Sequence, residues 1–121
     1  MVSVVDRFLE HSRISYFENG GNDEIYLSSA DWMPRNLDRR LEILFPILDR
    51  KLKKRIVDYL QDVFRDNQKS HMLNSKGEYV LKQPQANEKP FRLQESLCHE
   101  ALKREKNIRT TLPDIRPQKP K

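Results

Sequence analysis

The stretch that decides the fold reads RFLEHSRISYFENGGNDEIYLSSADWMPRNLDRRLEILFPI (residues 7–47). Two short apolar runs within it, at residues 14–17 and 25–27, predict β-strands. Between them lies NGGND (residues 19–23), whose glycines and asparagines tolerate positive φ angles and therefore favour a turn. We expect the two runs to form a hairpin or at least to lie side by side.

The segments around this hairpin carry weaker signals. The valines, Phe8 and Leu9 among residues 2–10 predict a short helix that leads into His11. After the hairpin, Pro34 fits the first turn of a helix, and Trp32 is expected to anchor the core. The nearly continuous apolar run at 41–47 is typical of a strand buried on both faces, with its pairing ended by Pro46.

The remainder of the chain starts with a clear helix and then loses its pattern. Asp49 can cap a helix whose apolar residues recur every three or four positions. A turn is expected at 75–77, a linker at 84–90 and a last helix at 93–106. The proline-containing, polar residues 107–121 are expected to form a disordered, basic tail.

Composition and charge narrow the class of protein. A chain of 121 residues is one domain's worth, and with 36% hydrophobic and 34% charged residues its core should be small. Residues 1–66 hold 11 basic and 12 acidic side chains, whereas residues 67–121 hold 12 basic and 6 acidic ones. A basic half suits a polyanionic partner such as nucleic acid or polyphosphate, although a solvated tail is the simpler explanation.

Cysteine usage and hydropathy bear on location. The single cysteine, Cys98, excludes an internal disulfide and a CxxC metal site, and it fits a reducing compartment. No apolar run approaches the ~20 residues that cross a bilayer, and residues 1–7 lack the pattern of a signal peptide. We expect a cytoplasmic chain without a transmembrane segment.

Polar side chains that could carry chemistry stand at the ends of the two strands. His11 and Arg13 precede the first strand and can share a face, because alternate residues of a strand do so. Ser28, Ser29 and Asp31 follow the second strand, with Asn36 beyond. A carboxylate within the apolar run at 41–47 needs a partner, since a buried unpaired charge is costly. The carboxylate is Glu42, and the candidate partners are His11, Arg13, Arg39 and Arg40.

The order His-x-Arg, Ser-Ser-x-Asp and then a glutamate resembles the half-site of the phospholipase D superfamily, which has His-x-Lys, Gly/Ser-Ser-x-Asn and Glu. Arginine at 13 and aspartate at 31 depart from that pattern and speak against ordinary phosphodiesterase activity. One branch of the superfamily matches better. The motifs FLEHSR, FENGG, SSADWM-x-RNLDRR and E-x-L-x-P-I resemble the second C-terminal domain of polyphosphate kinase. Weaker likenesses at 66–71, 74–79 and 91–95 extend this resemblance over residues 1–105.

The resemblance implies an enzyme that transfers the γ-phosphoryl group of ATP reversibly to polyphosphate, with Mg²⁺, through a phosphohistidine. In that family the phosphorylated histidine and the magnesium-contacting arginines lie in a preceding domain, so no metal ligands are expected in this chain. A second, ATP-contacting histidine carries over to His11 as the catalytic and nucleotide-binding residue. Position and charge add Arg13 and Arg35 as phosphate contacts, with a structural salt bridge to Asp31 or Glu42 as the alternative for each.

The expected fold is α/β: part of a phospholipase-D-like domain, with a short mixed sheet and flanking helices. Residues 1–106 would be the C-terminal portion of the last polyphosphate kinase domain, and residues 107–121 its tail. The chain alone should be inactive. The implied partners are ATP or ADP, polyphosphate and the N-terminal domains of the same homo-oligomeric enzyme, without specific nucleic acid. For the full enzyme, membrane association is left open.

Two rival functions remain. One is a polyanion-binding module that uses the basic residues of 67–121 and shows steep salt dependence. The other is a phospholipase-D-like phosphodiesterase half-domain that dimerises to build a two-histidine site.

Overall fold

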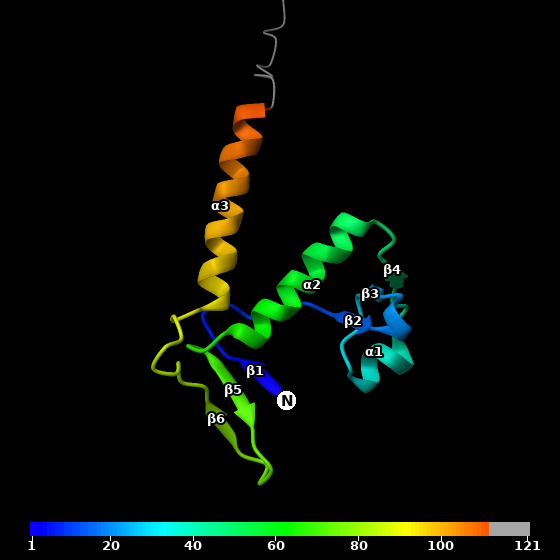
Figure 1. The fold of residues 1–121 in the computed structure, drawn as a ribbon. Helices are drawn as coiled ribbons and strands as arrows, with labels where there is room; N and C mark the ends of the chain where they lie inside the picture. Colours follow the sequence, from blue (N-terminus) through cyan, green and yellow to red (C-terminus); the bar gives the residue numbers. More distant parts are fainter. Residues whose placement is uncertain (112–121) are drawn as a thin grey trace, which may run out of the picture. The chain divides into compact units, whose positions relative to one another are not determined.

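The computed structural model describes the backbone of residues 1–111 and the side chains of residues 1–105. The chain divides into two compact units. The central unit is Phe8–Phe64, and the terminal unit combines Met1–Arg7 with the residues from Arg65 onward. Each unit holds one three-stranded antiparallel sheet (Figure 1). The predicted α/β class is therefore confirmed, but there are two short antiparallel sheets where the sequence suggested one mixed sheet.

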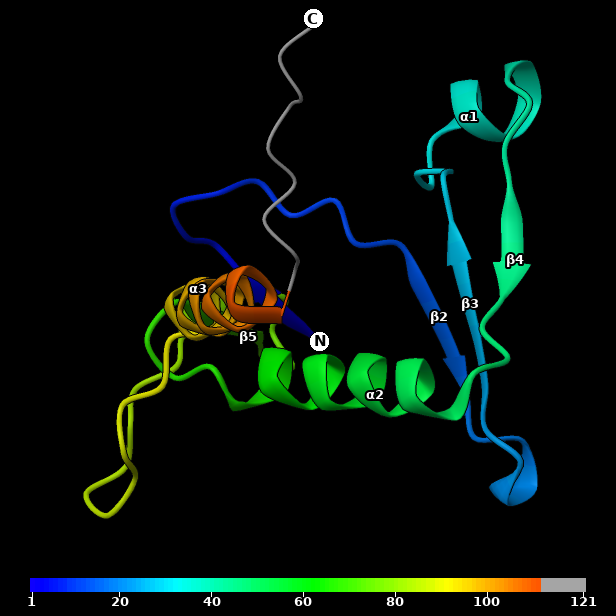
Figure 2. The ribbon, with the colours of Figure 1, turned by 90° about the horizontal axis from the view of Figure 1, so that it is seen from above.

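The sheet of the central unit confirms the predicted hairpin. It consists of β2 (Ile14–Phe17), β3 (Glu24–Ser28) and β4 (Leu44–Pro46), in the order β2-β3-β4. The short 3₁₀ turn η1 (Asn19–Gly21) joins β2 to β3, and all three of its residues have positive φ angles, from 42° to 93°. Figure 2 shows the three strands side by side, with this turn at one end of the sheet and the helix α1 at the other.

The strand β4 differs from the prediction. The apolar run at 41–47 contributes only three residues to it, and Leu44 and Phe45 remain 62% and 46% exposed. The prediction of a strand buried on both faces is wrong, since all three residues of β4 are exposed, and the strand also pairs on one side only. Proline suits such an edge, and one more backbone hydrogen bond follows it, from Ile47 to the carbonyl of Ile25 at 2.8 Å. The core of the unit is Ile25 on the middle strand, which is 1% exposed.

Two helices complete the central unit. The helix α1 (Pro34–Arg39) has its proline at the first position, as predicted. The helix α2 (Arg50–Arg65) begins where Asp49 accepts a hydrogen bond from the backbone N–H of Leu52 at 2.9 Å, which confirms the predicted cap. Trp32, expected in the core, is instead 97% exposed and lies in the loop between β3 and α1.

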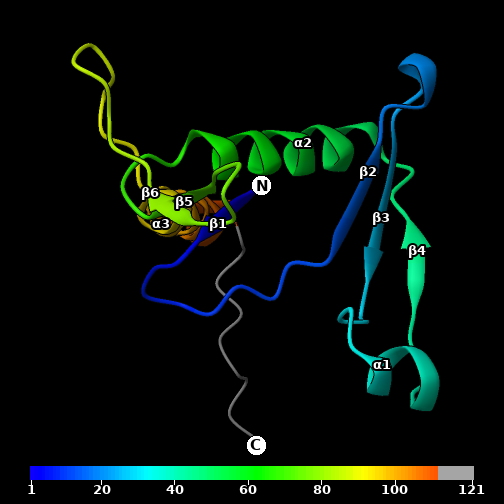
Figure 3. The ribbon, with the colours of Figure 1, turned by 90° about the horizontal axis from the view of Figure 1, so that it is seen from below.

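The sheet of the terminal unit consists of β1 (Val2–Val4), β5 (Ser70–Leu73) and β6 (Tyr79–Leu81). The predicted helix at 2–10 is wrong, since Val2–Val4 pairs with β5 and the residues after it form neither helix nor strand. Alternating β-branched valines fit a strand as well as one turn of a helix, and the available partner strand decides between them. Figure 3 shows β1 beside β5.

A buried carboxylate organises the terminal unit. Asp66 is 0% exposed, and its side chain accepts hydrogen bonds from four backbone N–H groups. Three belong to residues 68–70, at the start of β5, and the fourth, at 2.8 Å, belongs to Leu93 at the start of the helix α3 (Leu93–Thr111). Asp66 therefore caps α3 across 27 residues of sequence. The helix α3 continues past the predicted end at Lys106, in place of disorder at 107–111, and residues 112–121 of the predicted tail lie outside the described residues.

Candidate functional site

The sequence-predicted site residues gather at the end of the central sheet next to α1. His11 and Arg13 come just before β2, and Asp31 follows β3 after a short turn. In the antiparallel register Ile14 lies opposite Leu27, and the N–H of Ser28 donates to the carbonyl of Arg13 at 3.0 Å. The start of β2 and the end of β3 are therefore neighbours, as Figure 2 shows.

The guanidinium of Arg13 is engaged by the protein itself. Its Nε donates to Oδ1 of Asp31 at 2.5 Å, and its Nη1 donates weakly to the carbonyl of His11 at 3.4 Å. The hydrogen bond from Arg13 is the main cause that holds the pKa of Asp31 below its usual range. Of the two roles open to Arg13 in the sequence, the structure contains the salt bridge to Asp31.

The imidazole of His11 is exposed, and no hydrogen bond or ion pair engages it within residues 1–105. The same imidazole contributes to the lowered pKa of Asp31 through its charge, so it lies within electrostatic reach of that carboxylate. His11 thus stands beside the salt bridge with its ring nitrogens available to a ligand.

The serine turn after β3 has a structural task. The hydroxyl of Ser28 accepts from the N–H of Ala30, and that of Ser29 accepts from the N–H of Ile43, both at 3.0 Å. Ser29 also donates to the carboxylate of Glu42. The direct partner of Glu42 is therefore a serine and none of the four cationic candidates, although Arg13 lies close enough to interact with it through charge.

The helix α1 places two polar residues at this end of the sheet. Asn36 is buried, at 3% exposure, and its side chain donates to Asp31, while its Oδ1 has no hydrogen-bond partner within the described residues. The side chain of Arg35 is exposed and takes part in no hydrogen bond or ion pair among residues 1–105. Its guanidinium is available, in contrast to that of Arg13.

One contact to the segment that carries His11 escaped the sequence. The hydroxyl of Tyr59 on α2 lies 3.1 Å from Oγ of Ser12 and 3.4 Å from Oε2 of Glu10. Apolar periodicity predicted the helix that carries Tyr59, but periodicity carries no information about the partners of a tyrosine hydroxyl.

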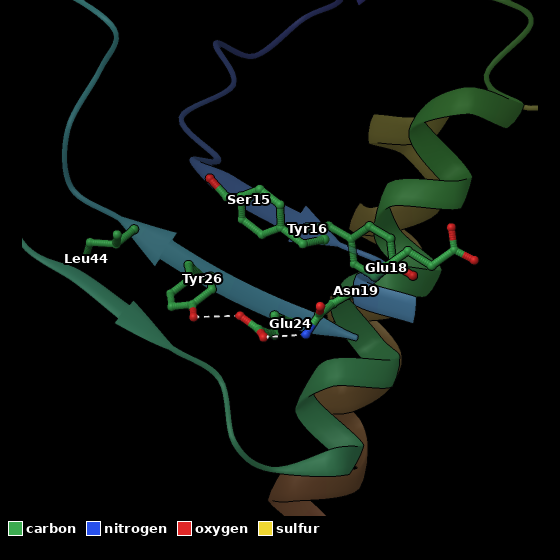
Figure 4. A pocket seen from close by; sticks show the side chains of 8 residues that line it. Ser15, Tyr16, Glu18, Asn19, Glu24, Tyr26 and Leu44 are labelled. Carbon is green, nitrogen blue, oxygen red and sulfur yellow. Dashed lines mark hydrogen bonds between the residues drawn. The ribbon is translucent and has the colours of Figure 1, made fainter. Parts of the chain in front are cut away.

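A separate hollow of about 920 Å³ lies on the central sheet (Figure 4). Tyr16, Glu24, Tyr26 and Leu44 are among its lining residues, and none of His11, Arg13 or Arg35 belongs to it. The carboxylate of Glu24 is occupied within it, since Tyr26 donates to one oxygen at 2.8 Å and Asn19 to the other at 2.7 Å. The hollow is therefore distinct from the end of the sheet where His11 stands.

Two further properties concern the described part of the chain. Among those residues, no three histidine, cysteine, aspartate or glutamate side chains gather as metal ligands would. No helix there is both long and apolar enough to pass through a membrane.

Comparison with known proteins identifies the family. The family described as Polyphosphate kinase C-terminal domain 2 matches residues 1–94. The chain belongs to this family. The polyphosphate kinase of Rhodopirellula baltica is 50% identical over 106 residues, which are 88% of this chain and 12% of that protein. The polyphosphate kinase of Halalkalibacterium halodurans is 49% identical over 92 residues, which are 76% of this chain and 13% of that protein.

A solved structure agrees with this assignment. The crystal structure of polyphosphate kinase from Porphyromonas gingivalis matches with a TM-score of 0.76 and 40% identity, over 88% of this chain and 16% of that one. The resemblance drawn from the motifs is thereby confirmed, as is the fold, since polyphosphate kinase has the phospholipase-D-like α/β fold. The chain spans 12% to 16% of the length of these polyphosphate kinases.

Proposed function

We propose that this chain supplies the nucleotide-facing histidine of a polyphosphate kinase, which transfers the γ-phosphoryl group of ATP reversibly to polyphosphate. The observation that carries the proposal is the exposed, unengaged imidazole of His11 beside the Arg13–Asp31 salt bridge, in a chain of this family.

Phosphoryl transfer depends mainly on positioning and on stabilising charge on the phosphate oxygens. An imidazolium donates charge-assisted hydrogen bonds to such oxygens. His11 would hold a phosphate of ATP in line for transfer, or give a proton to the leaving oxygen. The histidine that becomes phosphorylated belongs, in this proposal, to a part of the enzyme outside residues 1–121. The chain by itself should therefore not synthesise polyphosphate.

The two arginines divide their tasks in this proposal. Arg35, exposed and without a partner among the described residues, suits a direct contact with a phosphate group. Arg13 is committed to Asp31 and therefore shapes the site more than it binds the nucleotide. The Mg²⁺ that accompanies ATP would, in this proposal, be held by other parts of the enzyme.

The remaining parts of the proposal concern the setting. The partners would be ATP or ADP, polyphosphate and the other domains of the same homo-oligomeric enzyme, in the cytoplasm. Within the described basic half, Arg92 is paired with Asp6 and Arg104 with Glu100, which leaves fewer free cations for a separate polyanion-binding module.

A chimeric enzyme tests this function. The matching 106 residues of the Rhodopirellula baltica polyphosphate kinase would be replaced by those of this chain, and ATP-dependent polyphosphate synthesis measured. His11→Ala should lower kcat by about 10² or more, the usual effect of losing a proton donor, without changing the thermal unfolding of the chimera. His99→Ala, a change at an exposed histidine of α3, is the control and should leave synthesis unchanged. Undiminished synthesis by the His11→Ala chimera would overturn the proposal.

A further inference from the structure

We propose that Tyr59 is a positioning residue that fixes the segment carrying His11 by holding the side chains on both sides of it. This inference rests on the proposed function of His11 and adds a residue that neither the motifs nor the sequence pattern assign to the site.

The segment needs such a hold. Residues 5–13 form neither helix nor strand, so no ladder of backbone hydrogen bonds sets the place of His11. An exposed side chain on an irregular segment samples many orientations, whereas phosphoryl transfer demands a defined one. Something outside the segment has to restrict it.

Tyr59 reaches the segment at two points. Its hydroxyl lies 3.1 Å from Oγ of Ser12, directly after His11, and 3.4 Å from Oε2 of Glu10, directly before it. A phenol has one proton to donate and lone pairs to accept, so it can donate to the carboxylate of Glu10 and accept from the hydroxyl of Ser12 at once. Tyr59 thereby contacts the residues before and after His11 and leaves the imidazole of His11 without a contact to its hydroxyl.

The element that carries Tyr59 is itself fixed. Asp49 caps α2 at its start, and the Nζ of Lys53 donates to the carbonyl of Asp23, at the end of the hairpin turn, at 2.7 Å. Tyr59 is half-buried, and this burial is the main cause that raises the pKa of its hydroxyl, which therefore remains a donor at neutral pH.

A second hold acts on the backbone of the same segment. The Nη1 of Arg13 donates to the carbonyl of His11 at 3.4 Å while its Nε is anchored on Asp31. The segment is thus attached to α2 through Tyr59 and to the end of β3 through Arg13. Tyr59 contacts the neighbours of His11, and Arg13 contacts its backbone carbonyl. The imidazole ring therefore remains available to bind a phosphate.

The test uses the chimera described above. Tyr59→Phe keeps the ring and removes the hydroxyl; it should lower kcat about tenfold, with the KM for ATP nearly unchanged and the thermal unfolding midpoint preserved. Ser12→Ala removes one of the two partners of this hydroxyl and should cost less than tenfold, and the two changes together should cost no more than Tyr59→Phe alone. Tyr26→Phe, which deletes a hydroxyl that contacts Glu24, is the matched control and should leave kcat unchanged.

A combination with His11 separates positioning from other effects. In a His11→Asn chimera, Tyr59→Phe should cause no further loss of the residual rate. The same tenfold loss in that background would overturn the inference, because Tyr59 would then act independently of His11. A Tyr59→Phe chimera as active as the parent would also overturn the inference. If the His11→Ala chimera is inactive in the same assay, the proposed function of His11 still stands and only the role of Tyr59 is lost.

A measurement on the 121-residue chain itself adds a readout that needs no activity. NMR order parameters of the backbone amides of residues 10–13 should fall in Tyr59→Phe, with those of β2 and β3 unchanged. Equal order parameters at residues 10–13 in the two proteins would contradict a hold by Tyr59.

Discussion

Arg13 and Asp31, 18 residues apart in sequence, meet through a 2.5 Å contact between Nε and Oδ1. The contact joins the residue before β2 to the turn after β3 and so closes the end of the sheet at which His11 stands. Both side chains are partly exposed, at 26% and 42%. The salt bridge therefore serves mainly to define geometry, because ion pairs near water add little stability.

The first prediction concerns pH. Because Arg13 holds the pKa of Asp31 below its usual range, the pairing stabilises the folded chain at pH values above the unfolded pKa of about 3.9 and is lost as the pH falls through the lower folded value. The difference in unfolding free energy between the parent and Asp31→Asn should therefore shrink as the pH is lowered from 7 to 3. Chemical denaturation at several pH values measures it. A difference that stays constant over this range would contradict the assigned role of Asp31.

The second prediction separates the two arginines. In the chimera, Arg35→Ala should raise the KM for ATP about tenfold, the value of one charged hydrogen bond, and leave the unfolding midpoint unchanged. Arg13→Ala should lower the unfolding midpoint, because it leaves Asp31 without its main partner. Steady-state kinetics and thermal unfolding of both variants give the answer. The reverse pattern would assign the phosphate contact to Arg13.

The third prediction concerns the carboxylate that caps α3. Asp66→Ala should lower the free energy of unfolding by about 3–5 kcal/mol, because four backbone N–H groups lose their acceptor in a buried place. Asp58→Ala on α2 is the control: its exposed pair with Lys54 should be worth only about 0.5 kcal/mol. Urea unfolding compares them, and similar losses for the two would refute a special role for Asp66.

The fourth prediction concerns the turn between β5 and β6. Gly77 has a φ angle of 82°, and a Cβ placed there would meet no atom within 4 Å. Gly77→Ala should therefore cost about 1 kcal/mol through backbone strain alone. Gly77→Asn should cost less, because asparagine tolerates positive φ better than alanine. Thermal unfolding tests the order, and an alanine variant as stable as the parent would argue that this turn adapts.

Much of the central unit could be predicted from the sequence. The glycine-rich turn between β2 and β3, the proline that opens α1 and the aspartate that caps α2 are each set by the conformational preferences of a few neighbouring residues. His11, Arg13 and Arg35 remain the candidate site residues, and the motifs around them identified the family before any fold was known.

Predictions from the sequence were wrong where the conformation or burial of a segment depends on contacts with residues distant in sequence. The valines at residues 2–5 are compatible with a short helix, but pairing with β5 makes Val2–Val4 a strand. The apolar run at 41–47 is typical of a buried strand, but its strand β4 is exposed in the folded chain. The exposure of Trp32 likewise depends on where its loop leads.

The sequence by itself therefore determined the family, the hairpin turn, the helices that follow it, and His11 as the candidate site histidine. Only the tertiary structure decided that Arg13 forms a salt bridge with Asp31 and that Ser29 donates a hydrogen bond to Glu42. It also decided that Asp66 caps a helix 27 residues away and that the hydroxyl of Tyr59 contacts both neighbours of His11. The reason is physical: turns and caps depend on dihedral preferences within a few residues, whereas these contacts depend on where the folded backbone brings distant side chains together.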